Sequence, residues 1–132
     1  MAALMRAMLH RIRDVAGQHD VPLVFLFIPH PVDVTDHYDS WKIDRKHFPD
    51  YNGRNQIAPL EEMARTLQIP FVSLYDIYRQ HDANSLYFHE DDHWNATGQQ
   101  MAAEVMADYL LDNNLLGLRR TAGTLEHEGT TR

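Results

Sequence analysis

Apolar side chains recur every three or four residues in two stretches of this chain, one before and one after a continuous apolar run. In residues 2–16 the apolar stripe consists of Leu4, Met5, Met8, Leu9, Ile12 and Val15. In residues 57–67 it consists of Ile57, Leu60, Met63, Ala64 and Leu67. This spacing predicts two amphipathic helices, each with one face toward a core. Gly17 stands where the first helix would end, and Pro59 fits the second only in its first turn.

Residues 23–28 form the continuous apolar run, bounded by Pro22 and Pro29. Such a run is typical of a strand that is buried on both faces of a parallel sheet. A shorter strand is predicted over residues 69–74, after the second helix. The pattern therefore indicates an α/β fold with a parallel sheet flanked by helices. Two strands are few for this class, so the sheet looks incomplete, and its edges predict self-association or a partner chain.

The stretch from residue 30 to residue 53 is irregular and leaves the carboxyl end of the central strand. Ligands of open α/β sheets bind at that end, which makes His30, Tyr38, Ser40 and Trp41 candidates for substrate contact. The structural alternative for these residues is a turn for His30 and core coverage for the aromatic side chains.

Composition narrows the classes of partner. Twelve Lys and Arg against 19 Asp and Glu give a net charge of −7, and the basic residues are scattered, which argues against nucleic acid. The chain has no Cys, no apolar run long enough for a membrane span and no signal-peptide pattern at its start, and it leaves the localisation open. Residues 116–132 lose all periodicity and are expected to form a disordered tail.

The most specific feature is the run His89-Glu90-Asp91-Asp92-His93-Trp94-Asn95-Ala96-Thr97-Gly98. Asp91 and His93 fit an acid–base pair, in which the carboxylate accepts the Nδ1 proton and Nε2 is left to take a proton from a nucleophile. Asn95 is a suitable N-cap for the helix that follows. The apolar positions of that helix are Met101, Ala102, Val105, Met106, Tyr109 and Leu110.

This Asp-x-His-Trp-Asn-x-x-Gly block resembles the last catalytic block of SGNH (GDSL-type) hydrolases, in the branch similar to alginate O-acetyltransferase accessory proteins. The likeness covers about residues 1–111 and implies an SGNH-like, flavodoxin-like three-layer sandwich over residues 1–115. It also implies Asp91 and His93 as catalytic residues, no cofactor, and a small-molecule or carbohydrate O-acyl ester as substrate.

The resemblance implies a serine nucleophile in a Gly-Asp-Ser block that this chain does not contain. The chain therefore resembles a C-terminal portion of the domain, with the nucleophile expected outside it in a missing N-terminal half. Ser40, Ser73 and Ser85 are the internal alternatives, and none has the Gly-Asp-Ser context.

Three alternatives stay open at this point. Most SGNH proteins carry Asp-x-x-His, a spacing that would make Glu90 instead of Asp91 the carboxylate that orients His93. In an extended segment His89, Asp91 and His93 would share one face and could bind zinc or iron. The chain could also be a non-catalytic interaction module or a pseudo-enzyme that pairs with another chain.

Overall fold

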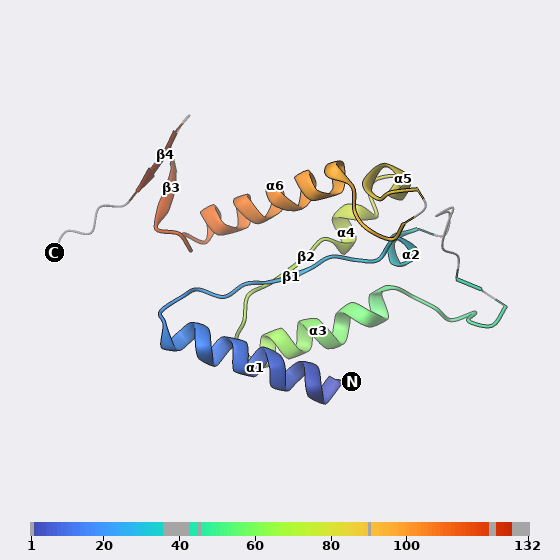
Figure 1. The fold of residues 1–132 in the computed structure, drawn as a ribbon, viewed down its shortest axis with the longest axis horizontal. Coiled ribbons are helices and arrows are strands. Elements are labelled where there is room, and N and C mark those ends of the chain that lie inside the picture. The colour runs from blue at the N-terminus through green and yellow to red at the C-terminus, as the bar shows by residue number, and fades with distance from the viewer. Residues whose placement is uncertain (1, 36–42, 45, 90, 122–123, 128–132) are drawn as a thin grey trace.

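The computed structural model describes residues 2–35, 43–44, 46–89, 91–121 and 124–127. Its elements are α1 (Ala2–Gln18), β1 (Phe25–Phe27), α2 (Pro31–Val34), α3 (Arg54–Thr66), β2 (Phe71–Ser73), α4 (Tyr75–Tyr78), α5 (Ala83–Leu86), α6 (Ala96–Asp112), β3 (Leu118–Thr121) and β4 (Thr124–His127). Figure 1 shows α1 and α3 on one side of the β1 and β2 strands and α6 on the other. Helices thus lie on both sides of the sheet.

The central sheet consists of β1 and β2, paired in parallel with Phe25 opposite Phe71 and Phe27 opposite Ser73. The α3 helix makes the crossover between the two strands, as a parallel pair requires. The predicted α/β class, with an incomplete parallel sheet between helices, is confirmed. The prediction that the first strand is buried on both faces is wrong for this chain. The side chains of β1 are only half-buried, because the helices cover the two faces only in part.

The predicted first helix is confirmed as α1, but Gly17 does not end it. The last turn closes with a Schellman motif, in which Val21 N–H donates to the Ala16 carbonyl (2.9 Å) and Asp20 N–H donates to the Gly17 carbonyl (3.3 Å). Asp20 takes the left-handed conformation that this motif needs, with φ of 52°. Gly17 lies inside the helix with nothing within 4 Å of the position a Cβ would occupy. The prediction that Gly17 ends the first helix is therefore wrong.

The predicted second helix is confirmed as α3, but it begins at Arg54, so Pro59 lies beyond the first turn. The extra turn is held by Gln56 N–H donating to the Gly53 carbonyl (3.1 Å) and by Arg54 N–H donating to Oδ1 of Asn52 (3.0 Å). Pro59 is exposed, and the hydrogen bond that its missing N–H would have made is lost on the solvent side of the helix.

The main core lies at the carboxyl ends of the two strands. It is formed by α2, α3, α4, α5, α6 and the segments between them. Its buried members are Val34, Ile57, Leu74, Tyr75, Tyr78, Ala83, Leu86, Tyr87 and Ala102. A second, smaller cluster joins Leu9 of α1 to Met63, Leu67 and Ile69. The acid–histidine run begins two residues after Tyr87, so the main core supports the start of that segment.

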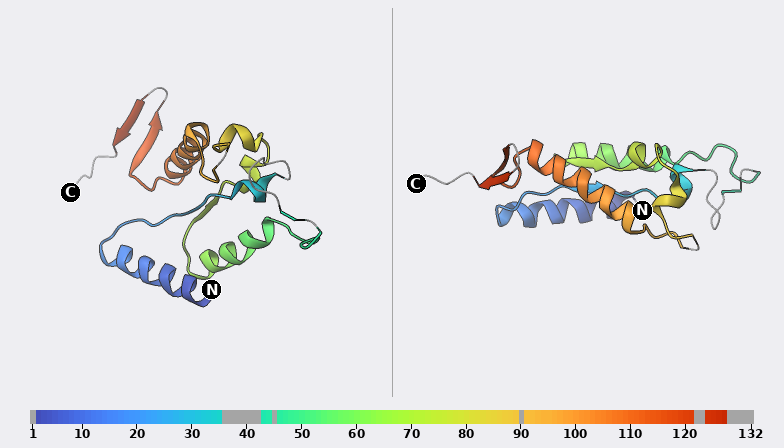
Figure 2. Two further views of the ribbon diagram at one scale, coloured as in Figure 1. Left: turned by 45° about the vertical axis from the view of Figure 1, so that its right-hand side comes forward. Right: turned by 90° about the horizontal axis from the view of Figure 1, so that it is seen from above.

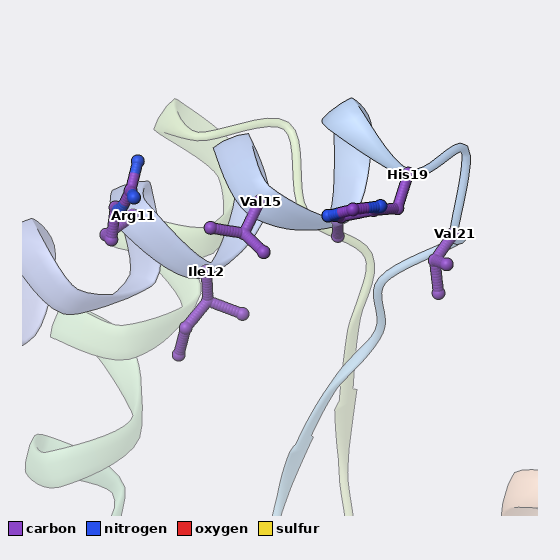
Figure 3. Close-up of a pocket in the computed structure, with 6 residues that line it drawn as sticks. Arg11, Ile12, Val15, His19 and Val21 are labelled. Carbon is purple, nitrogen blue, oxygen red and sulfur yellow. The ribbon is translucent and has the colours of Figure 1, made fainter.

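Much of the α1 stripe has no cover among the described residues. Only Leu9 of its large apolar side chains is buried, whereas Leu4, Met8 and Ile12 are 67, 52 and 47% exposed. The end of α1 also borders a shallow hollow that Figure 3 shows, lined by Arg11, Ile12, Val15, Ala16, His19 and Val21. This hollow precedes β1 and lies at the opposite end of the sheet from the acid–histidine run (Figure 1). In the described part of the chain no helix is both long and apolar enough to cross a bilayer.

The end of the chain contains an antiparallel hairpin where the sequence predicts a disordered tail. The β3 and β4 strands pair with Leu118 opposite His127 and Thr121 opposite Thr124. Figure 2 shows this hairpin projecting beyond the end of α6. Two short strands satisfy one another's backbone N–H and C=O groups without needing an apolar stripe, and for this reason hydropathy gives no signal for them.

Candidate active site

Residues 87–89 and 91–94 belong to a tight loop whose two ends are joined by backbone contacts. Tyr87 and Trp94 make an antiparallel bridge, and Phe88 N–H donates to the His93 carbonyl (3.0 Å). Inside the loop, Asp91 N–H donates to the Phe88 carbonyl (3.2 Å). These bonds turn the chain back within a few residues and place Asp91 and His93 on the exposed tip.

Asn95 fixes the junction between this loop and α6. Its Oδ1 accepts from the N–H groups of Thr97 (2.9 Å) and Gly98 (3.2 Å), which confirms the predicted N-cap. Its Nδ2 donates to the carbonyls of Ser85 (3.0 Å) and Tyr87 (3.1 Å). One side chain therefore caps the helix and also ties it to the segment before the loop, a second role that an N-cap pattern does not reveal.

Gly98 allows the first turn of α6 to approach the loop. A Cβ at this position would lie 2.5 Å from the Leu86 carbonyl oxygen and 3.2 Å from Cβ of Trp94. Gly98 thus has a packing role at this junction. Trp94 is half-buried and packs against the main core, so it anchors this end of the loop.

Two buried tyrosines connect the loop to the rest of the fold. The spacing of apolar residues in the sequence did not identify either of them. The Tyr87 hydroxyl donates to the Pro29 carbonyl (2.5 Å), so the loop is held at the carboxyl end of β1. The Tyr78 hydroxyl donates to the Gly98 carbonyl (2.7 Å), and burial raises the pKa of Tyr78 to about 12. The Tyr78 phenol thus stays a hydrogen-bond donor throughout the physiological range.

The structure brings Asp91 and His93 together at the tip of the loop. Oδ1 of Asp91 contacts Nδ1 of His93 and also accepts from the His93 backbone N–H (3.1 Å). No described residue is bonded to Nε2 of His93, and its side chain is 74% exposed. The hydrogen bond that the His93 ring donates to Asp91 raises the pKa of His93, and the same bond lowers the pKa of Asp91. This is the carboxylate–imidazole arrangement in which Nε2 can accept a proton.

Asp92 lies between two histidines. Its Oδ1 is 3.4 Å from Nδ1 of His93, and its Oδ2 is 3.1 Å from Nε2 of His30. His30 comes from the carboxyl end of β1, as the sequence predicts, and it also caps α2. His30 therefore forms a turn, as the structural alternative predicted, and it also lies beside the acid–histidine loop.

A cluster of possible metal ligands exists among the described residues, but it differs from the predicted one. The ligand atoms of Asp91, Asp92 and His93 lie within 4.8 Å of one another, and His89 is not in this group. All three side chains are substantially exposed, and the Nδ1 atom that faces the two carboxylates is already engaged by Asp91. The arrangement is explained by hydrogen bonding alone.

The internal serine alternatives do not meet His93 in the described part of the chain. Ser73 is half-buried in β2, where its Oγ accepts from Tyr75 N–H (3.3 Å). The Ser85 hydroxyl donates to the Asp82 carbonyl (2.6 Å). The other sequence-based candidates lie outside the described residues, namely Tyr38, Ser40, Trp41 and Glu90.

Comparison with known families agrees with the α/β fold described above. The model of the SGNH hydrolase-like domain of the acetyltransferase AlgX matches residues 2–132, almost the whole chain. The chain therefore belongs to this family of SGNH hydrolase-like domains. No curated protein and no solved structure gives a significant match.

The Asp91 contact predicts how His93 titrates. Because Asp91 favours the imidazolium, His93 should lose its proton above the ordinary value of 6.5, and Asp91→Asn should move this titration to lower pH. Histidine ring signals followed by NMR against pH in the 132-residue chain measure both values. Asp44→Asn, which removes the exposed carboxylate that contacts His47, is the matched control and should not move His93. A His93 titration that Asp91→Asn leaves unchanged would contradict the assigned contact.

Proposed function

We propose that this chain supplies the acid–base part of an active site that cleaves or transfers O-acyl esters. Asp91 orients His93, and the serine nucleophile comes from sequence outside this chain. The observation that carries the proposal is the contact between the Asp91 carboxylate and Nδ1 of His93, on a loop anchored to the carboxyl end of β1. Membership of a family described as SGNH hydrolase-like and acetyltransferase supports acyl chemistry.

In the proposed reaction a serine Oγ attacks the acyl carbonyl carbon while its proton moves to Nε2 of His93. The imidazolium, stabilised by Asp91, then gives that proton to the oxygen of the departing alcohol, and an acyl-serine is left. Water or an acceptor hydroxyl attacks the acyl-serine in the second half and loses its proton to Nε2. The bond between the acyl carbon and the serine Oγ then breaks, and the imidazolium returns the proton to that oxygen. The exposed Nε2 is consistent with a hydroxyl that approaches from outside the described residues. We propose a small-molecule or carbohydrate O-acyl ester as substrate.

The chain by itself is expected to show almost no esterase activity, because the serine that His93 would activate lies elsewhere. Turnover of p-nitrophenyl acetate by the 132-residue chain should not exceed that of an equal concentration of free imidazole. In a longer polypeptide that joins this segment to an in-frame Gly-Asp-Ser block, activity should appear and be lost on serine modification by a fluorophosphonate. Turnover by the isolated chain well above imidazole, abolished by the same reagent, would place the nucleophile inside this chain and contradict the proposal.

We further propose that the isolated chain associates with itself or with the rest of its domain. The uncovered apolar residues of α1 and the open edges of the β1 and β2 pair support this. Light scattering over a concentration series should show a mass that rises above 15.4 kDa. The double variant Leu4→Gln and Met8→Gln, which changes exposed side chains only, should lower the mass toward that of the monomer. A monomer at every concentration would show that these faces need no partner.

A further inference from the structure

His30 lies 62 residues before Asp92 in the chain, yet the two side chains meet at the carboxyl end of β1. The ring nitrogen Nε2 of His30 is 3.1 Å from Oδ2 of Asp92. Both side chains are partly exposed, at 35 and 41%. This contact joins the loop that carries Asp91 and His93 to an element outside the loop.

The other atoms of His30 fix the direction of its ring. Nδ1 accepts from Val32 N–H (3.3 Å), and the His30 backbone N–H donates to Oδ2 of Asp33 (3.2 Å), which completes a capping box at α2. A ring nitrogen that accepts a hydrogen bond carries no proton, so the ring hydrogen is on Nε2. His30 is therefore a donor to Asp92 whose orientation is set by α2.

Pro29 and Pro31 hold this donor in place from both sides. Both are among the most deeply buried residues of the chain, and the Pro29 carbonyl accepts the Tyr87 hydroxyl (2.5 Å). The Tyr87 bond fixes the start of the loop, whereas the His30 bond reaches Asp92 at its tip. The second bond therefore joins the tip of the loop to an element outside the loop.

The carboxylate of Asp92 extends the contact to His93. One oxygen accepts from His30, and the other lies 3.4 Å from Nδ1 of His93. A carboxylate is planar, so a partner that holds one oxygen also sets the direction of the other. The order of contacts is thus His30, Asp92 and His93.

We propose that His30 is a positioning residue, which holds Asp92 against His93 and so fixes the loop that carries the Asp91 and His93 pair. The effect on turnover rests on the proposed function, but the effect on the loop does not. His30 touches no reacting atom in this scheme. It acts through Asp92, which in turn contacts His93 from the side opposite its base nitrogen Nε2.

Two substitutions separate the cap from the contact with Asp92. Oδ1 of Asn stands as many bonds from Cα as Nδ1 of His, so His30→Asn keeps the cap on α2 but cannot reach Asp92. Nε2 of Gln stands as many bonds from Cα as Nε2 of His, so His30→Gln can still donate to Asp92. Asp92→Asn keeps an acceptor oxygen for His30, and Asp92→Ala removes it.

Amide hydrogen exchange in the 132-residue chain tests the contact without any activity. In His30→Asn, exchange at Phe88 N–H, which closes the loop on the His93 carbonyl, should become about tenfold faster. Exchange at Thr35 N–H, which reports on α2 through its bond to the Pro31 carbonyl, should not change. His30→Gln should restore slow exchange at Phe88. The double variant His30→Asn and Asp92→Ala should exchange no faster than either single one.

Kinetics in the longer polypeptide with its serine provide the second test. His30→Asn should lower kcat about tenfold with KM unchanged, and His30→Gln should recover most of the loss. If exchange at Phe88 is unaffected by His30→Asn, the positioning role is wrong. A rise in KM alone would make His30 a substrate contact, and would also overturn it. An active Asp91→Asn enzyme would contradict the proposed function, while the exchange result would still decide the role of His30.

Discussion

Asp91→Asn is expected to lower kcat about 10⁴-fold in the polypeptide that joins this domain to its serine, by analogy with the loss of the orienting Asp in a serine protease triad. The Asn side chain can present an N–H to Nδ1 of His93, which favours the tautomer with its hydrogen on Nε2. Nε2 then cannot take the proton of the serine. The loss should appear in kcat measured on an acetyl ester at saturating substrate, while KM changes little.

Three further variants decide which carboxylate matters. Asp44→Asn removes a carboxylate that contacts an exposed histidine, His47, away from this loop, and should leave kcat unchanged. Glu90→Gln should have little effect, because Asp91 already contacts Nδ1 of His93. Asp92→Asn should have only a small effect, because it keeps an acceptor for His30. If Glu90→Gln silences the enzyme while Asp91→Asn stays active, Glu90 orients His93 and the assignment of Asp91 is wrong.

Gly98→Ala is expected to lower the free energy of unfolding by about 1–3 kcal/mol. The added Cβ would lie 2.5 Å from the Leu86 carbonyl oxygen, a backbone atom that accepts the Asn95 N–H (2.8 Å) and cannot move without breaking that bond. Chemical denaturation followed by circular dichroism measures the loss. The His93 titration should also return toward 6.5 if the loop geometry is lost.

Gly17→Ala is the matched control for Gly98→Ala. Gly17 is exposed within α1, and nothing lies within 4 Å of its potential Cβ. Alanine there should stabilise the chain by about 0.5–1 kcal/mol, because glycine is the weaker helix former. If Gly98→Ala is as well tolerated as Gly17→Ala, then the approach of α6 to the loop is looser than described, and Gly98 has no packing role.

Local signals in the sequence were sufficient for the main elements and for the acid–histidine pair. The α1, α3 and α6 helices follow from apolar residues at helical spacing, and the N-cap follows from the hydrogen-bonding capacity of Asn95. The contact between Asp91 and His93 joins residues two positions apart, so a short turn is enough to form it. The family membership rests on a match over residues 2–132.

Helix ends were less predictable, because they depend on backbone conformation rather than hydropathy. Asp20, Gln68 and Asn114 adopt left-handed conformations that are usual for glycine, and all three end helices. Gly17 is the glycine that a sequence pattern selects, yet it stays within α1. The residue at which each helix ends therefore depends on how the helix packs against the core, and this packing is known only from the folded structure.

The amino-acid sequence was enough to predict the α/β order of elements and the pairing of Asp91 with His93, and it shows that this chain contains no Gly-Asp-Ser block. Only the tertiary structure decided that His30 and Tyr87 hold the loop, because each bond joins residues about 60 positions apart that meet only when the parallel strands pair. Spacing rules act over one or two helical turns or along one strand. Contacts across the fold follow instead from which chain segments end at the same edge of the sheet.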